Sequence, residues 1–184
     1  HEYFQPELVT EEQVVDDCLR HYDALYVLEP HVSRSAQSKI SEWTRGGGLL
    51  WTCSNSLLRD EYDGSSDWLA KEVGIRRVGD SAGRIATIKP VPGQPSFRPH
   101  AVTFGRRFDK VSLEGGLTRA IYDDGSPAWL EKPLGRGRVV YVGHRAGLTY
   151  SGQRISIGGR SVVWADAGRD TLTRPLRESS EEQP

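Results

Sequence analysis

Cys53 and His144 are the two residues whose types and positions could support covalent catalysis. Cys53 ends a short apolar run in GGGLLWTCSNS, where the chain must turn, and His144 follows a second apolar run in RVVYVGH. A cysteine nucleophile needs a thiolate, a neighbouring imidazole that accepts its proton, and donors for the oxyanion. The sequence offers the first two of these parts, so covalent catalysis by Cys53 is one hypothesis for the function.

The run that ends at Cys53 resembles the nucleophile elbow of the class I glutamine amidotransferase-like superfamily. That superfamily carries small residues two positions before and two after its cysteine, and a glutamate two positions after a late histidine. Here Trp51 and Asn55 flank the cysteine, and Ala146 replaces the glutamate. Asn tolerates a left-handed backbone, but an indole is hard to fit into a tight turn, and no carboxylate orients the histidine. We therefore favour an ordinary thiol and keep a cysteine-dependent amidase or amidotransferase as the alternative.

An N-terminal helix is predicted over residues 10–21. Thr10 and Gln13 have the spacing of a capping box, in which each side chain accepts a backbone hydrogen bond from the other residue. Apolar residues then recur every three or four positions, a pattern that places Cys18 on the buried face of the helix.

A βαβ unit is predicted next. Residues 24–28 are continuously apolar, as expected of a strand that is covered on both faces in a parallel sheet. Ser33 or Ser35 can cap the following helix, the glycines at 46–48 can end it, and residues 49–53 form the second strand. Parallel strands joined by a helix indicate an α/β fold.

The second half of the chain is predicted to be rich in strands. Its turn signals are Asp124-Gly125 and the glycines of GRG at 135–137, and the run RVVYV is the best candidate for a central strand. The predicted elements are a short helix at 66–73, strands at 120–122, 128–131 and 138–142, and a last helix at 161–174.

A second resemblance covers most of the chain. The segments YDALYVLEP, SRSAQSKISEWTRGGGLLWTCSN and DDGSPAWLEKPLGRGRVVYVG look like the β-galactosidase trimerisation domain of family 42 glycoside hydrolases. The resemblance implies a three-layer, flavodoxin-like α/β sandwich with a mostly parallel sheet over residues 1–160. It implies that residues 161–184 are a linker helix and polar tail that lead to a further domain. It also implies a non-catalytic assembly role, with the other domains and subunits of a homo-oligomeric, carbohydrate-active protein as partners.

Three other candidate sites were weighed. The acidic residues at 60–67 lack the spacing of a calcium loop, so we expect a solvated loop and no metal. The triple glycine at 46–48 follows a helix and precedes a strand, the reverse of a phosphate-binding loop, so no nucleotide cofactor is expected. If the domain binds a sugar, Trp68 and Trp129 are the candidate stacking residues, although tryptophans are more often packing residues.

The composition of the chain argues against two classes of partner, nucleic acids and membranes. The 184 residues include 24 Lys and Arg and 25 Asp and Glu, a formal net charge of −1, which gives no basic field for nucleic acid. No apolar run is long enough to span a membrane, so a soluble segment is expected. The sequence contains no methionine, from which we expect an excerpt of a larger protein. The compartment, cytoplasmic or secreted, is not fixed by these residues.

Overall fold

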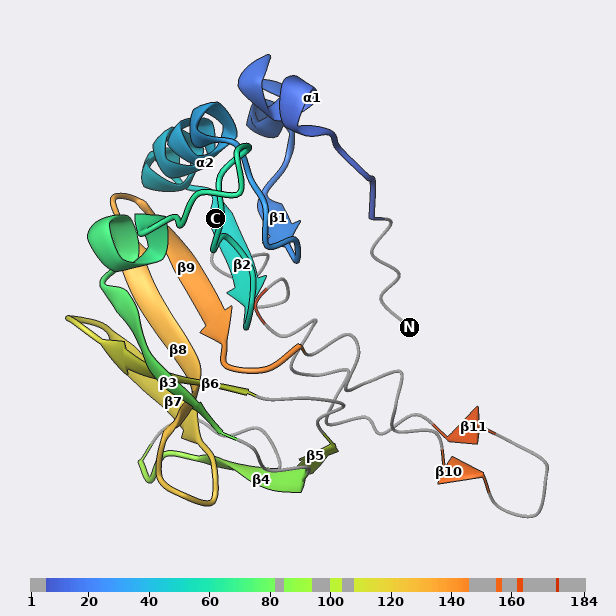
Figure 1. Cartoon of the computed structure of the whole chain (residues 1–184), viewed down its shortest axis with the longest axis vertical. Coiled ribbons are helices and arrows are strands. Elements are labelled where there is room, and N and C mark those ends of the chain that lie inside the picture. The colour runs from blue at the N-terminus through green and yellow to red at the C-terminus, as the bar shows by residue number, and fades with distance from the viewer. Residues whose placement is uncertain are drawn as a thin grey trace.

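The chain has an α/β fold built on a mixed seven-stranded sheet (Figure 1). The structure is a computed structural model, and it describes residues 6–81, 85–93, 100–103, 108–145, 155–156, 162–163 and 175. In spatial order the strands of the sheet are β1 (Ala24–Val27), β2 (Leu49–Cys53), β9 (Gly137–Val142), β8 (Pro127–Leu134), β7 (Leu117–Ile121), β4 (Ile85–Pro90) and β5 (His100–Thr103).

The prediction of a mostly parallel sheet is wrong. Only the β1–β2 and β2–β9 pairs are parallel within the described sheet, and the other four pairs are antiparallel. The reason lies in the short connections between β7, β8 and β9. Gly125 (φ 79°) and Gly135 (φ 65°) lie in tight turns, and a turn of a few residues can join only antiparallel neighbours.

The remaining described elements are short. They are helix α1 (Glu11–Val15), 3₁₀ helix η1 (Cys18–His21), helix α2 (Arg34–Gly46), π-helix η2 (Leu69–Val73), an antiparallel pair of β3 (Ile75–Ser81) with β6 (Phe108–Leu113), and an antiparallel pair of β10 (Ile155–Ser156) with β11 (Val162–Val163). The predicted last helix at 161–174 lies largely outside the described residues, and at Val162–Val163 the chain is a strand instead.

The first predicted helix is present but broken. Its capping box is confirmed: the Gln13 amide donates to Thr10 Oγ1, and the Thr10 amide donates to Gln13 Oε1. The helix ends early because Asp17 takes a left-handed backbone (φ 65°), and Lys39 Nζ holds its carboxylate at 2.8 Å. Cys18 consequently lies in the 3₁₀ turn, partly buried against the core.

The βαβ unit is confirmed, with one correction. Ser33 caps α2 by accepting from the Ala36 amide, Gly47 ends it at φ 131°, and all five residues of β2 are buried. The predicted strand at 24–28 is β1, but it is the terminal strand of the described sheet and is only partly buried. Leu28 just beyond it is 51% exposed.

Two apolar cores lie on the two faces of the sheet. One contains Leu50, Val139 and Leu130 together with side chains from α1, η1, α2 and η2, and the other contains Trp51, Val140 and Trp129 with further strand residues. In the part of the chain that the structure describes, the helices therefore pack on one face of the sheet. Figure 1 shows α1 and α2 together beside β1 and β2.

Candidate functional site

The turn after β2 does not have the geometry of a nucleophile elbow. In such an elbow the nucleophile itself sits on a sharp, strained turn that leads directly into a helix. Here the left-handed residues are Asn55 (φ 69°) and Leu57 (φ 57°), not Cys53. Residues 54–67 form turns and loop before η2 begins, so no described helix N-terminus faces the sulfur.

The Cys53 thiol is buried among hydroxyl and carbonyl groups. Cys53 is 3% exposed, and its Sγ lies 3.5 Å from Ser56 Oγ and 3.7 Å from the Ser54 carbonyl oxygen. A substrate carbonyl would need an open approach to the sulfur, and burial removes that approach.

His144 lies directly after β9, as predicted, and is also buried. It is 2% exposed, and its Nδ1 lies 2.9 Å from the Tyr122 hydroxyl. Burial raises the pKa of Tyr122 well above its ordinary value, so the phenol that contacts the imidazole stays neutral. A phenol in this position does not supply the negative charge by which a carboxylate stabilises an imidazolium.

A buried carboxylate from β6 organises this region. Asp109 Oδ2 accepts from the Tyr141 hydroxyl at 3.0 Å and from the Asn55 amide at 3.2 Å, and Arg77 Nε lies 2.8 Å from Oδ1. The carboxylate thus ties the turn after β2 to β9 and β3. We did not predict Asp109 as a site residue, because it lies 54 positions from Asn55 and no local motif surrounds it.

Trp51 occupies the space that a small residue would leave open. It is fully buried, and its ring stacks on that of Tyr26 with centroids 5.1 Å apart. Among the described residues its indole nitrogen has no hydrogen-bond partner, so apolar packing and ring stacking are the contacts observed for this side chain. The predicted crowding of the turn is therefore present as a packed core.

The two candidate sugar-stacking tryptophans are both buried. Trp129, on β8, is 2% exposed and belongs to the core on the Trp51 face, so it presents no ring face to a sugar. Trp68 is 8% exposed, but it lines a cavity. Only Trp68 remains in a position to meet a ligand.

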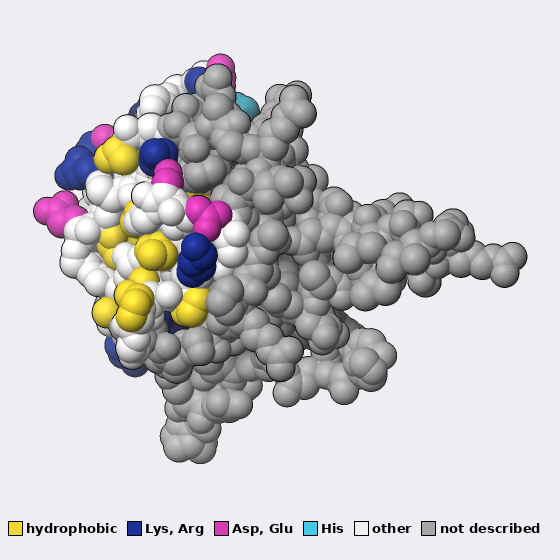
Figure 2. Space-filling view, turned by 90° about the horizontal axis from the view of Figure 1, so that it is seen from below, with side chains coloured by type: hydrophobic (Ala, Val, Ile, Leu, Met, Phe, Trp, Pro, Cys, Tyr) yellow, Lys and Arg dark blue, Asp and Glu magenta, His cyan; other side chains and the backbone are white. Residues whose placement is uncertain are grey.

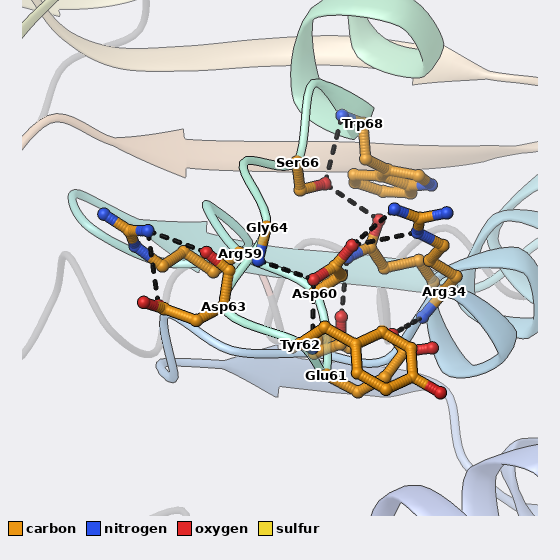
Figure 3. Close-up of polar contacts among 11 residues, drawn as sticks. Arg34, Arg59, Asp60, Glu61, Tyr62, Asp63, Gly64, Ser66 and Trp68 are labelled. Atoms are coloured by element: carbon orange, nitrogen blue, oxygen red, sulfur yellow. Dashed lines mark hydrogen bonds and ion pairs between the residues drawn. The ribbon is translucent and has the colours of Figure 1, made fainter.

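The acidic segment after β2 is only partly the solvated loop that we predicted. Asp60 is buried: Arg34 donates to its Oδ2 from Nε at 2.9 Å and Nη2 at 2.6 Å (Figure 3). The amides of Tyr62 and Gly64 donate to its Oδ1. Arg34 first, and then these amides, lower the pKa of Asp60. The carboxylate fixes the loop, while Tyr62 at its tip is 84% exposed.

Two adjoining cavities lie beside this loop. The larger, which we call the polar cavity, has a volume of about 400 Å³ and is lined by Arg34, Gln37, Ser38, Asp60, Ser65, Ser66, Asp67, Trp68, Lys71 and Glu72. The second, about 310 Å³, is more apolar and includes Asp109 and Tyr141 in its wall. Neither Cys53 nor His144 lines either cavity.

In the part of the chain that the structure describes, no group of three or more His, Cys, Asp or Glu side chains is arranged to hold a metal ion. None of the helices described has the length and apolar character needed to cross a lipid bilayer.

The burial of the thiol predicts slow alkylation of both cysteines. Iodoacetamide at pH 7 is expected to label Cys53 at least about 100-fold more slowly in the folded chain than in urea. Cys18 is the internal comparison: burial and the neighbouring Asp16 raise its pKa, but its partial exposure should allow faster labelling than at Cys53. Peptide mass spectrometry over time measures both rates, and labelling of Cys53 faster than a model thiol would contradict the assignment of an inert thiol.

No protein-family model and no curated protein sequence matches the chain. Among solved structures it is similar to the β-galactosidase of Bacillus circulans sp. alkalophilus, with a TM-score of 0.70 and 17% identity over 92% of this chain and 24% of that chain. It is also similar to the cold-adapted β-galactosidase of Rahnella sp. R3, with a TM-score of 0.67 and 18% identity over 89% of this chain and 24% of that chain.

A third similar structure has this fold over about three quarters of its length. A cytoplasmic protein of Salmonella typhimurium aligns with a TM-score of 0.63 and 12% identity over 89% of this chain and 74% of that chain. The chain thus spans about a quarter of the β-galactosidases and about three quarters of the Salmonella protein. At these identities the likeness shows the fold: the chain has the α/β fold that forms part of several β-galactosidases.

Proposed function

We propose that the chain is a non-catalytic assembly or accessory domain of a larger carbohydrate-active protein of the β-galactosidase type. One observation carries the proposal: 92% of this chain aligns with only 24% of a β-galactosidase, as expected if a glycosidase used this fold as one domain among several. The finer assignment, to the trimerisation domain of family 42 and to the amidotransferase-like superfamily, is part of this proposal. The same holds for the division at residue 160.

The turn after β2 supports a role without cysteine chemistry. Cys53 and His144 are buried, neither lines either of the two cavities described, and the left-handed residues follow the cysteine rather than coincide with it. The amidase alternative needs an accessible sulfur, and nothing observed at this turn favours it over the assembly role.

Exposed apolar side chains support a role in assembly. Figure 2 shows hydrophobic side chains open to solvent between charged ones on one face. Leu28 and Tyr62 are 51% and 84% exposed, on two segments joined by hydrogen bonds from Leu57 to Glu29 and from Arg59 to Pro30. Leu28 directly follows β1, the terminal strand of the described sheet, and Tyr62 lies at the tip of the loop that pairs with the segment after β1. Tyrosines are enriched in protein interfaces, so this exposed apolar surface is consistent with assembly.

This proposal predicts self-association through the surface beside β1. The protein that contains the chain is expected to be a homo-oligomer by light scattering. Leu28→Lys is expected to weaken association at least about tenfold, because a charge would be buried in the interface. Ser112→Lys, at an exposed position of β6, is the matched control and should change nothing. A monomeric protein would remove the assembly role.

A further inference from the structure

We propose that the polar cavity binds a neutral carbohydrate of one or two sugar rings. The inference goes beyond the assembly role and does not depend on it, because it rests on the cavity alone. At about 400 Å³ the cavity falls within the roughly 300–1,000 Å³ that is usual for small-molecule sites. The side chains of Arg34, Asp67 and Lys71 are 75%, 66% and 72% exposed, so the cavity opens to solvent along them.

The position of the cavity is that of a ligand site in an α/β fold. Arg34, Gln37 and Ser38 come from the first turns of α2, which follows β1, and residues 60–68 come from the loop that follows β2. β1 and β2 are parallel, so both of these segments lie beyond the carboxyl ends of the strands. Ligands of open α/β sheets bind on this side of the sheet, beyond the carboxyl ends of the strands.

The charges of the cavity favour a neutral ligand. Two cations, Arg34 and Lys71, face three carboxylates, Asp60, Asp67 and Glu72, which leaves a formal charge of −1. Each carboxylate has a cationic partner: Arg34 for Asp60 at 2.6 Å, Lys71 for Asp67 at 2.8 Å, and Arg45, outside the cavity, for Glu72 at 2.7 Å.

These pairs disfavour both kinds of charged ligand relative to a neutral one. An anion such as phosphate would meet carboxylates and no uncompensated cation, and a cation would meet carboxylates that are already paired. A neutral molecule with many hydroxyl groups can instead donate to carboxylate oxygens and accept from guanidinium and amide hydrogens.

The hydrogen-bonding groups of the cavity are held in place before a ligand arrives. Gln37 Nε2 donates to the Val32 carbonyl at 2.7 Å, and Ser66 Oγ donates to Gln37 Oε1 at 2.9 Å. Glu72 is fixed through Oε2 by Ser41 and Arg45, which also lower its pKa and keep it ionised. Groups that are already ordered lose little entropy when a ligand binds.

Hydrogen-bonding capacity remains on these fixed groups. Within the described residues, Glu72 Oε1 and Arg34 Nη1 take part in no hydrogen bond, although the other polar atoms of both groups do. A carboxylate oxygen and a guanidinium N–H are a matched acceptor and donor for neighbouring hydroxyls of a sugar ring.

Trp68 contributes an aromatic side chain to the lining of the cavity, although the residue is only 8% exposed. Its backbone amide donates to Ser66 Oγ at 3.3 Å (Figure 3). The face of an aromatic ring carries partial negative charge, and the C–H groups of a sugar carry partial positive charge, so the two pack favourably. An aromatic side chain in the lining, beside fixed polar groups, suits a sugar ring that has one apolar face and a rim of hydroxyl groups.

The test is a titration of the ¹⁵N-labelled chain with D-galactose and lactose, followed by NMR. Binding is expected at millimolar concentrations, with shifts at the Trp68 indole N–H, the Arg34 Nε–H and the amides of residues 65–72. Inorganic phosphate is the comparison ligand and should shift none of these signals. Absence of shifts with either sugar up to 100 mM would overturn the proposal, and so would shifts that lie elsewhere or a cavity response to phosphate alone.

Ser38→Tyr tests the site without removing any of its contacts. Ser38 is exposed on α2 and lines the cavity, so a tyrosine there fills the space and is expected to weaken sugar binding at least about tenfold. Ser112→Tyr, exposed on β6 and in neither cavity wall, is the matched control and should bind as the unmodified chain does. Equal binding by both variants would contradict the assignment. Both chains must show the far-UV circular dichroism of the unmodified chain.

Discussion

Replacing Trp51 with alanine is expected to lower the free energy of unfolding by about 3–5 kcal/mol. Trp51 is on β2, between β1 and β9, and its side chain is fully buried and stacks on Tyr26. Truncation removes one of the two tryptophan side chains of that core and leaves a cavity that a β-sheet can close only in part. Urea denaturation followed by circular dichroism measures the loss.

A matched control separates the effect of burial from the effect of removing an aromatic side chain. Tyr62→Ala removes an aromatic side chain that is 84% exposed, so its effect on the free energy of unfolding should stay within about 0.5 kcal/mol. A loss of less than about 1 kcal/mol for Trp51→Ala would show that the turn after β2 has room to rearrange. That result would weaken the argument that the Trp51 indole fills the space that a nucleophile elbow needs.

Replacing Gly137 with alanine is expected to cost about 3 kcal/mol or more of the free energy of unfolding. A Cβ at this first residue of β9 would lie 2.1 Å from the Thr44 carbonyl oxygen and 2.3 Å from that of Gly48. Both neighbours are backbone atoms at the end of α2, so relief requires the helix end or the strand to move. The packing of α2 on the sheet should loosen, as thermal denaturation and amide exchange would show.

Gly46→Ala is the matched control for this prediction. Gly46 lies at the end of α2, a Cβ there meets nothing within 4 Å, and its φ is not positive. Alanine favours the helix over glycine, so the free energy of unfolding should stay unchanged or rise by up to about 1 kcal/mol. Equal losses in the two variants would mean that the contact between Gly137 and the end of α2 is not the cause.

The local signals in the sequence predicted the βαβ unit well. Ser33, the glycines at 46–48 and the apolar run of β2 each specify a cap, a helix end or a buried strand through short-range chemistry. The strand at 138–142 was placed correctly, and it pairs with β2 at the centre of the sheet. Asn55 takes the left-handed backbone that its short polar side chain tolerates.

The direction of the remaining strands could have been predicted and was not. The turn signals at Asp124-Gly125 and at 135–137 lie between runs too close together for a crossover, so they require hairpins. The resemblance to a parallel α/β family outweighed this local evidence in our prediction. Short turns decide strand direction more directly than family resemblance does.

The contacts that define the site depend on distant parts of the chain. The Asp109 carboxylate meets the Asn55 amide across 54 positions, and Asp60 meets Arg34 across 26. Each of these acidic residues lies in a polar stretch of sequence, which predicts a solvent-exposed position. Its burial follows only from the tertiary fold. The polar cavity was missed for the same reason, although Trp68 had been singled out for its residue type.

The fold alone does not decide the function. The same architecture makes up about a quarter of two β-galactosidases and about three quarters of a Salmonella protein. The case for a non-catalytic domain therefore rests on the turn after β2, where the sulfur is enclosed and Asp109 fixes the backbone at Asn55.

The most direct test of that case is amide hydrolysis by the chain and by its Cys53→Ala variant, measured as ammonia released from L-glutamine and from simple amides. We predict that the two rates are equal and that neither exceeds the rate without protein. A faster release by the unmodified chain that disappears in Cys53→Ala, with the fold intact, would contradict the account and assign cysteine chemistry to this domain.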